Sequence, residues 1–393
     1  MKPLSEITTQ FTESVIREMT RISSARGGVN LAQGFPDFDP PLTIRQAAIE
    51  AIQKGWNQYA VTFGEADLRE AIAVKALQYN RIVCDPGTDV TVTCGATEAM
   101  IATLKALVNP GDEIIIFEPF YENYGPDAIL SGAIPRYVTL RSPDWFYDSK
   151  ELAAAFNKNT KAIIINTPNN PTGKVFSRKE LEEISRLCIK WDVMAITDEI
   201  YEHILYDQET HISMASIEDM AKRTVTINSL SKTYSVTGWR VGWAIAGADI
   251  TSRIRKVHDF LTVGAPTPFQ KAGVCALNMS GDYYTALQKR YEDARNRICG
   301  VLKTVGFNVE MPKGAYYIMA RTDALMDRYK EVDANGFCLK LMDITGIATV
   351  PGTAFYHTRA MGKDQVRFCF AKNETTIQDV CRRLERLLLE KDV

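Results

Sequence analysis

Four polar segments of the sequence each follow a short apolar run, and they contain the kinds of side chain that reactive sites use. The segments are Cys94–Thr97, Asn166–Gly173, Asp198–Tyr201 and Ser229–Lys232. A neutral lysine is a nucleophile, a carboxylate beside an apolar run needs a cationic or hydrogen-bonding partner, and backbone N–H groups at the start of a helix bind phosphate. Together these residue types predict a site for a phosphorylated ligand and for amine chemistry.

Each segment taken alone also has an ordinary structural interpretation. Gly95–Thr97 is compatible with a plain strand-to-helix turn, and Asn169–Gly173 with a rigid β-turn. Asp198 is compatible with a helix cap that has Tyr201 packed beside it, and a single lysine such as Lys232 is most often solvated. The occurrence of four such segments at equivalent positions favours a shared site over four unrelated turns.

A single charge, Arg367, interrupts the apolar run Val366–Phe370 near the C-terminus. A solvent-facing position on an edge strand explains it. A buried position is the alternative, and it would require a carboxylate partner, which the planar guanidinium binds through two parallel hydrogen bonds. The run itself does not distinguish these two alternatives.

The middle of the chain alternates apolar runs with helical patterns, which is typical of βαβ units and a mostly parallel sheet. Ligand sites in such sheets lie beyond the carboxyl ends of the strands, so the four polar segments are expected to face one cavity. We predict helices at about Thr97–Val108 and Ser177–Trp191, the second with a Ser177 cap and Glu180 three residues later. The predicted strands are Val90–Thr93, Glu113–Phe117, Ala162–Asn166, Met194–Thr197, Thr224–Asn228 and Val241–Ala246.

The last third of the chain has a different pattern. A long charged helix is predicted at about Asp282–Val305, followed by isolated strands near Tyr316–Met319 and Val366–Phe370 and a final amphipathic helix from about Thr375 to Glu390. We therefore predict a large α/β domain, residues 43–280, and a smaller α+β domain formed by residues 1–42 and 281–393.

Composition excludes several classes of partner. The 393 residues carry a formal net charge of −2, which does not favour binding to nucleic acid, and no apolar stretch is long enough to span a membrane. Met1–Met19 has no apolar core, so it does not read as a secretory signal. The eight cysteines form no Cys-x-x-Cys pair and only four histidines occur, so we expect a reduced, cytoplasmic protein without a metal site.

A reactive lysine, a carboxylate, a tyrosine hydroxyl, phosphate donors and a carboxylate-binding arginine are what a pyridoxal phosphate site requires. The string Ser229-Leu230-Ser231-Lys232-Thr233, followed by Thr237-Gly238-Trp239-Arg240, matches the lysine signature of the class I aminotransferases of fold type I. The sequence resembles this family along nearly its whole length. Gln33–Phe38 and Arg367–Phe370 are most similar to the kynurenine/glutamine aminotransferase branch.

The resemblance implies an α/β fold in which a mostly parallel seven-stranded sheet lies between helices, with a smaller α+β domain. It implies that Lys232 bonds covalently to the cofactor and is the general base, with Asp198 on the pyridine nitrogen and Tyr201 on the phenolic oxygen. It also implies a homodimer with shared active sites, because Tyr59 in Asn57-Gln58-Tyr59 would reach the neighbouring subunit's phosphate. Further cofactor contacts are implied for Gly95, Ala96, Thr97, Tyr121, Asn170, Ser229, Ser231 and Arg240, and substrate contacts for Gly34, Asn170 and Arg367.

The implied reaction is a ping-pong transfer of an amino group between an L-amino acid and a 2-oxo acid. A broad specificity is expected, with glutamine, kynurenine, methionine, aromatic or aspartate donors. The alternatives are a cysteine-conjugate β-lyase, a cofactor-binding regulatory module and a nicotinamide dehydrogenase. Only about 30 residues precede Gln33, too few for a fused DNA-binding domain, and no Gly-x-Gly-x-x-Gly string occurs. The N-terminal tryptophan of some relatives has no counterpart, and no arginine is assignable to a substrate's distal carboxylate, so side-chain specificity stays open.

Overall fold

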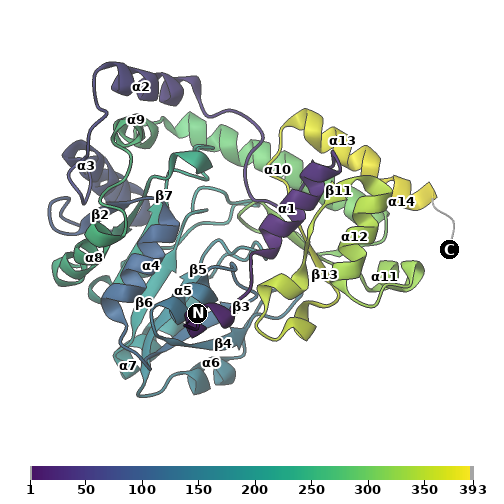
Figure 1. The fold of residues 1–393 in the computed structure, drawn as a ribbon, viewed down its shortest axis with the longest axis horizontal. Coiled ribbons are helices and arrows are strands. Elements are labelled where there is room, and N and C mark those ends of the chain that lie inside the picture. The colour runs from purple at the N-terminus through teal and green to yellow at the C-terminus, as the bar shows by residue number, and fades with distance from the viewer. Residues whose placement is uncertain (1, 390–393) are drawn as a thin grey trace.

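The computed structural model describes residues 2–389, and a seven-stranded sheet forms its centre (Figure 1). Five consecutive strands of this sheet, β7, β6, β5, β3 and β4, pair in parallel. Strand β8 is antiparallel to both of its neighbours, β2 and β7. The predicted mostly parallel seven-stranded sheet is therefore confirmed. In spatial order the strands are β2 (Val90–Thr93), β8 (Gly242–Ile245), β7 (Thr224–Ser229), β6 (Met194–Asp198), β5 (Thr160–Asn166), β3 (Glu113–Glu118) and β4 (Ile134–Thr139).

Strand β4 is the one strand of this sheet that the sequence analysis did not predict. It lies at the sheet edge, and Pro135 and Arg136 interrupt its apolar pattern. Proline is tolerated on an edge strand because one side of that strand needs no ladder hydrogen bonds. The apolar pattern alone therefore did not mark this strand.

Helices cover both faces of the sheet, and alternate residues of each strand point to opposite faces. Ile114, Ile116 and Ile164 pack with α4 (Ala96–Leu107), α5 (Tyr124–Leu130) and α8 (Ala248–Leu261). On the other face, Ile115 and Ile163 pack with α7 (Arg178–Trp191), while α6 (Ser149–Ala155) lies near the same edge as β4. The predicted Ser177 cap is present as a full capping box with Glu180.

A second, four-stranded antiparallel sheet is formed by the C-terminal third. Its order is β12 (Val350–Pro351), β13 (Gln365–Cys369), β10 (Tyr317–Arg321) and β9 (Asn308–Val309). The N-terminal segment joins this part of the fold, because β1 (Val29–Asn30) pairs in parallel with β11 (Ile347–Ala348), and α1 lies beside it (Figure 1). The helices here are α1 (Val15–Ala25), α10 (Gly281–Thr304), α11 (Asp323–Tyr329), α12 (Ala334–Thr345), α13 (Glu374–Leu384) and α14 (Arg386–Leu389).

The final helix predicted from Thr375 to Glu390 is two helices, because α13 ends at Leu384 and α14 begins at Arg386; Glu390 lies outside the described residues.

Helices α2 (Leu42–Gln53), α3 (Ala66–Lys75) and α9 (Thr267–Leu277) pack together beyond β2, and α3 continues as a π-helical turn, Ala76–Asn80. Among residues 2–389, no helix combines the length and the apolar character needed to cross a bilayer. Short 3-10 turns occupy Glu6–Thr9, Met214–Ser216, Ala221–Arg223, Thr237–Trp239, Gly352–Phe355 and Arg359–Gly362.

Candidate active site

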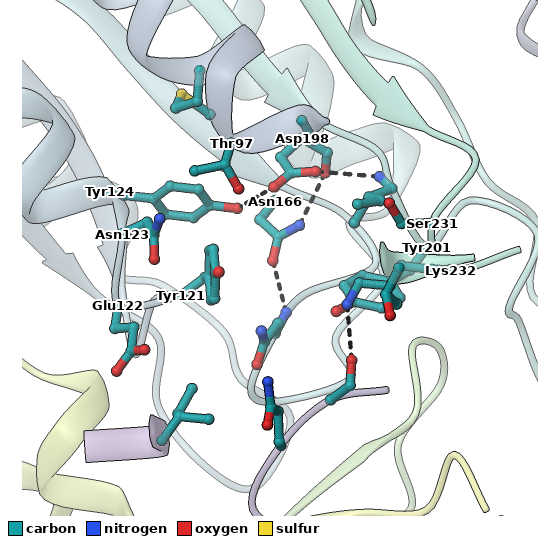
Figure 2. A pocket seen from close by; sticks show the side chains of 18 of the residues that line it. Thr97, Tyr121, Glu122, Asn123, Tyr124, Asn166, Asp198, Tyr201, Ser231 and Lys232 are labelled. Atoms are coloured by element: carbon teal, nitrogen blue, oxygen red, sulfur yellow. Dashed lines mark hydrogen bonds between the residues drawn. The ribbon is translucent and has the colours of Figure 1, made fainter. Parts of the chain in front are cut away.

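All four polar segments meet at one edge of the large sheet. Strands β2, β5, β6 and β7 run in the same direction, so their carboxyl ends lie together, and the antiparallel strand β8 begins at that edge just after Arg240. Most of the predicted site residues line one cavity there (Figure 2). They are Gly34, Ala96, Thr97, Tyr121, Asn170, Asp198, Tyr201, Ser231, Lys232, Arg240 and Arg367.

Three predicted residues do not line this cavity. Gly95 and Ser229 lie next to residues that line it, and the Ser229 hydroxyl accepts a hydrogen bond from the Ser231 N–H at 3.1 Å. Tyr59 is 87% exposed and lies outside the cavity of its own chain.

The Lys232 amine lies inside the cavity, against a backbone carbonyl from the other part of the fold. Its Nζ donates to the Gly34 carbonyl at 2.8 Å, and the Tyr316 hydroxyl donates to the same oxygen at 3.0 Å. The pKa of Lys232 is lowered from 10.5 to about 8, mainly by burial and also by Arg240 and Arg367, while Cys369 and Asp198 oppose this. Loss of hydration on burial has a larger effect on this pKa than the positive neighbours have.

Gly34 approaches the tyrosines closely enough that no other residue fits. A Cβ atom at this position would overlap the Tyr317 hydroxyl. The Tyr317 hydroxyl in turn lies 2.9 Å from the Tyr201 hydroxyl, so Tyr201 is held by a neighbour from β10. Figure 2 shows Tyr121 across the cavity from Tyr201 and Lys232. A flat ligand has room between these two walls.

Asp198 ends strand β6 with a buried carboxyl group. Its Oδ2 accepts a hydrogen bond from the Tyr124 hydroxyl at 2.6 Å, its Oδ1 accepts one from the Ile200 N–H at 3.3 Å, and it forms no ion pair within residues 2–389. Burial raises the pKa of Asp198, against the effect of these hydrogen bonds and of Lys232. A cationic partner would therefore stabilise the ionised form. The sequence analysis missed Tyr124; its position three residues after Tyr121 was the available signal.

The start of α4 forms an anion-binding corner. The first N–H groups of a helix have no partner within the helix and carry the positive end of its dipole. Gly95 caps this helix with φ +83°, and an added Cβ there would overlap the Arg240 guanidinium. Arg240 is held by the Thr237 carbonyl at 3.0 Å and the Cys94 carbonyl at 3.3 Å. Its positive charge and the Thr97 and Ser231 side chains thus lie around the helix start.

Arg367 is fully buried on β13, which has a neighbouring strand on each side, so the solvent-facing edge position is wrong. Its Nη1 donates to the Asn170 Oδ1 at 2.9 Å, and its Nη2 donates to the Ala32 carbonyl. The Nε atom has no hydrogen-bond partner, and no carboxylate among the described residues pairs with the guanidinium. A buried charge without a counter-ion is costly, so this group is suited to an anion that enters the cavity.

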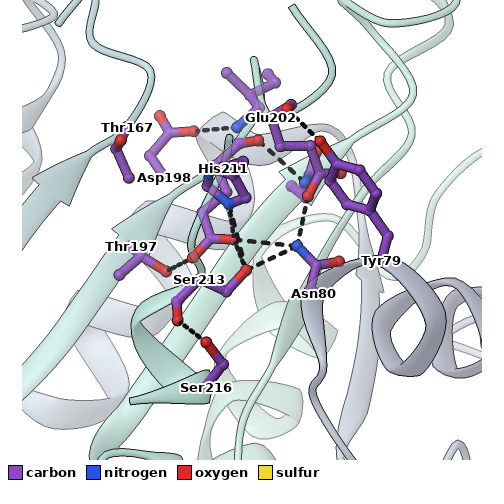
Figure 3. A network of polar contacts seen from close by, with 12 residues as sticks. Tyr79, Asn80, Thr167, Thr197, Asp198, Glu202, His211, Ser213 and Ser216 are labelled. Atoms are coloured by element: carbon purple, nitrogen blue, oxygen red, sulfur yellow. Dashed lines mark hydrogen bonds and ion pairs between the residues drawn. The ribbon is translucent and has the colours of Figure 1, made fainter. Parts of the chain in front are cut away.

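A buried polar network lies behind the Asp198–Tyr201 segment and was not predicted (Figure 3). Glu202 pairs with Lys75 from α3 and accepts a hydrogen bond from Asn80 at 2.7 Å. Glu199 accepts a hydrogen bond from the Ser213 hydroxyl at 2.5 Å, and its carboxylate lies 2.8 Å from the Nε2 atom of His211. These contacts anchor the backbone that carries Asp198 and Tyr201.

Glu199, Glu202 and His211 also bring potential metal-ligating atoms within 4.8 Å of one another. Protein donors already satisfy these carboxylates, and the Lys75 ammonium supplies the local positive charge. The carboxylates of this network are therefore satisfied by the protein itself, whereas the buried Nδ1 atom of His211 has no hydrogen-bond partner among the described residues.

The cavity fits pyridoxal phosphate and an amino acid on three independent features. The α4 corner suits a phosphate, the buried Asp198 carboxyl suits a protonated pyridine nitrogen, and the unpaired Arg367 Nε suits a carboxylate. Lys232 lies in the same cavity with a lowered pKa, as an amine that reacts with an aldehyde must. The fold and the site together define a pyridoxal phosphate enzyme of fold type I.

Comparison with known proteins agrees with this class. The family described as aminotransferase class I and II matches residues 26–384, so the chain belongs to this family, whose class I members use pyridoxal phosphate. A probable N-succinyldiaminopimelate aminotransferase from Mycobacterium tuberculosis (strain ATCC 25618 / H37Rv) is 37% identical, over 96% of this chain and 96% of its own. Kynurenine–oxoglutarate transaminase 1 from Homo sapiens is 35% identical, over 95% of each chain. A solved structure of a methionine aminotransferase from Escherichia coli superposes with a TM-score of 0.92 at 34% identity, covering 98% of this chain and 100% of that one. The chain is an aminotransferase, and the predicted family and activity are confirmed.

Proposed function

We propose that this aminotransferase transfers amino groups at the cavity between Tyr121 and Lys232, with the residue roles given above. The observation that carries the assignment is the buried Arg367 guanidinium, whose Nε is free and whose neighbour Asn170 lines the same cavity. In this proposal Arg367 and Asn170 bind the substrate α-carboxylate, which fixes the α-carbon relative to Lys232. The cofactor, when bound, supplies an aldehyde and a ring that accepts electrons from the α-carbon.

The protein side of the reaction follows from the contacts. Ala96, Thr97, Ser231 and Arg240 would hold the phosphate, with Gly95 and Ser229 shaping that corner. Asp198 would keep the ring nitrogen protonated, and Tyr201 and Asn170 would contact the phenolic oxygen. Neutral Lys232 Nζ would take the proton from the substrate's α-carbon and deliver it to the cofactor carbon that carries the aldehyde in the free cofactor.

A panel of amino donors and 2-oxo acids tests this function. Aspartate, glutamine, methionine, kynurenine and the aromatic amino acids are each paired with several oxo acids, and the new amino acid is measured by chromatography. We expect a new amino acid from several donors. Pyruvate and ammonia from a cysteine conjugate, with no new amino acid, would indicate the β-lyase instead. A negligible rate with every pair and every conjugate would contradict the proposal.

Cofactor uptake is expected to depend on the protonation of Lys232. With a pKa of about 8, about a tenth of the amine is neutral at pH 7 and about half at pH 8. The rate constant for pyridoxal phosphate uptake by the apoenzyme should therefore rise about fivefold between pH 7 and 8 and level off above pH 9. Absorbance changes measure this rate, and division by the rate constant of the neutral amine of Nα-acetyllysine at the same pH removes the cofactor's own ionisation. A ratio that rose to pH 10 would contradict the lowered pKa.

Removal of the Tyr124 hydroxyl is expected to weaken cofactor binding. In Tyr124→Phe the ionised Asp198 carboxylate loses its 2.6 Å hydrogen bond, so its pKa rises further and it pairs less well with a ring cation. We expect the Kd for pyridoxal phosphate to increase about tenfold, measured by titration of the apoenzyme. Tyr137→Phe is the control, because its hydroxyl makes no hydrogen bond to a described residue. Equal Kd values for the two variants would contradict the role of Asp198.

We also propose a cytoplasmic homodimer in which Tyr59 of one subunit reaches the phosphate corner of the other. The exposure of Tyr59, 87%, supports this proposal. The division into residues 43–280 and residues 1–42 with 281–393 is likewise proposed, supported by the two separate sheets and by the pairing of β1 with β11.

A further inference from the structure

A second cavity adjoins the candidate active site on the side of the N-terminal helix. The two cavities share five residues as walls, namely Ser14, Arg17, Glu122, Asn123 and Asp127. The outer cavity extends from them to His357 and Arg359. In Figure 2, Glu122 and Asn123 lie across the inner cavity from Lys232, so a substrate side chain that points away from Lys232 meets this shared wall.

Two arginines that form no ion pair with a described residue line the outer cavity. The guanidinium groups of Arg17 and Arg359 are exposed, and neither forms an ion pair or a hydrogen bond with a described residue. Arg17 stands in the first turn of α1 and lines both cavities, whereas Arg359 lines the outer one alone. Two cations are thus placed one after the other along a path that leads out of the site.

The acidic groups of the same walls compensate this charge only in part. Glu13 is already paired with Arg21 at 2.5 Å, and Glu122 accepts a hydrogen bond from the Ser14 hydroxyl. Asp127 is buried, its Oδ2 has no hydrogen-bond partner among the described residues, and burial raises its pKa to about 7. A carboxyl group that is partly protonated near pH 7 repels an anion in the cavity less than a fully ionised one would.

We propose that the outer cavity is a subsite for the distal carboxylate of a long amino-acid side chain, which Arg17 binds at the inner end and Arg359 at the outer end. This inference rests on the proposed function, because it assumes that the α-carboxylate lies on Arg367. It names the substrate class as α-amino acids with a terminal carboxylate beyond three or more methylene groups. Such a group crosses the shared wall, which a short side chain does not reach.

Three donors of matched length separate the possible end groups. 2-Aminopimelate carries a carboxylate after four methylene groups, 2-aminoheptanoate carries a methyl group there, and lysine carries an ammonium group. The holoenzyme is assayed with each donor and one oxo acid, as wild type and as Arg17→Gln, Arg359→Gln and the double variant. Arg253→Gln is the matched control, because Arg253 is exposed on α8, away from both cavities.

We expect wild type to prefer 2-aminopimelate to 2-aminoheptanoate in kcat/KM. Loss of one arginine should lower kcat/KM for 2-aminopimelate about fivefold, mainly through KM, and the double variant should lose more. The rate with 2-aminoheptanoate should stay within twofold in every variant, and the preference should weaken in high salt. A wild-type preference for lysine or 2-aminoheptanoate, or equal losses for both donors in the double variant, would overturn the subsite.

Binding of non-reacting acids gives a readout independent of turnover. Calorimetry of the holoenzyme should show pimelate binding more tightly than heptanoate, and the double variant should lose most of this difference. An equal difference in wild type and double variant would also overturn the subsite. If methionine and the aromatic donors react while 2-aminopimelate shows no advantage, the subsite fails and the proposed function stands. If no donor reacts, the proposed function itself fails.

Discussion

Replacement of Lys232 with alanine is expected to lower the rate of transamination at least about 10⁴-fold, because the variant loses both the covalent attachment of the cofactor and the general base. The side chain projects into the cavity and bonds to the Gly34 carbonyl, and its loss removes no part of either sheet. The folded structure should therefore persist, as measured by circular dichroism and by the melting temperature.

The matched control is Lys256→Ala, which removes an exposed lysine of α8 and should leave the rate unchanged. Borohydride reduction of the wild type with pyridoxal phosphate should label the peptide that contains Lys232. Label on another peptide, or substantial turnover by a folded Lys232→Ala protein, would contradict the assignment.

Replacement of Arg367 with alanine is expected to lower kcat/KM by about two to three powers of ten for every amino donor. Loss of one partner from a buried, hydrogen-bonded charge pair costs about 3–4 kcal/mol, and about 1.4 kcal/mol corresponds to a factor of ten. Because the partner here is the α-carboxylate that all amino acids share, the loss should be the same for methionine, glutamine and phenylalanine.

Arg367→Lys is the second variant, because it keeps the positive charge if the alanine variant does not fold. Lysine lacks the planar fork that binds Asn170, Ala32 and a carboxylate at once, so a loss of about tenfold or more is expected. A decrease in kcat/KM that depended on the donor's side chain would show that Arg367 binds the side chain and not the α-carboxylate.

The position of the site at one sheet edge was predictable, and the physical reason lies in strand direction. Asp198 ends a strand, Lys232 and Asn170 follow strands of the same orientation, and the carboxyl ends of such strands converge. The strands themselves were marked by apolar runs flanked by polar turns. Only β4, whose run is interrupted by Pro135, escaped this pattern.

The contacts between the two sheets were not predictable from local patterns. Tyr317 and Arg367 lie on the paired strands β10 and β13, where Tyr317 is opposite Cys369 and Met319 is opposite Arg367. Both side chains line the cavity only because the small sheet packs against the large one. Tyr124 and Arg17 were also missed, because each lines the cavity beside residues that are distant from it in sequence. Burial of Arg367 follows from the number of strands beside β13, which its own sequence does not reveal.

The pairing of β1 with β11 has a consequence for synthesis on the ribosome. Gly34 lies four residues after the end of β1 and accepts a hydrogen bond from Lys232, yet the partner of β1 is Ile347–Ala348, more than 300 positions later. A nascent chain can complete the seven-stranded sheet by residue 245, whereas the segment from Val29 to Gly34 must wait until Ile347 and Ala348 have emerged. We therefore expect translation products that end before Ile347 to capture no pyridoxal phosphate.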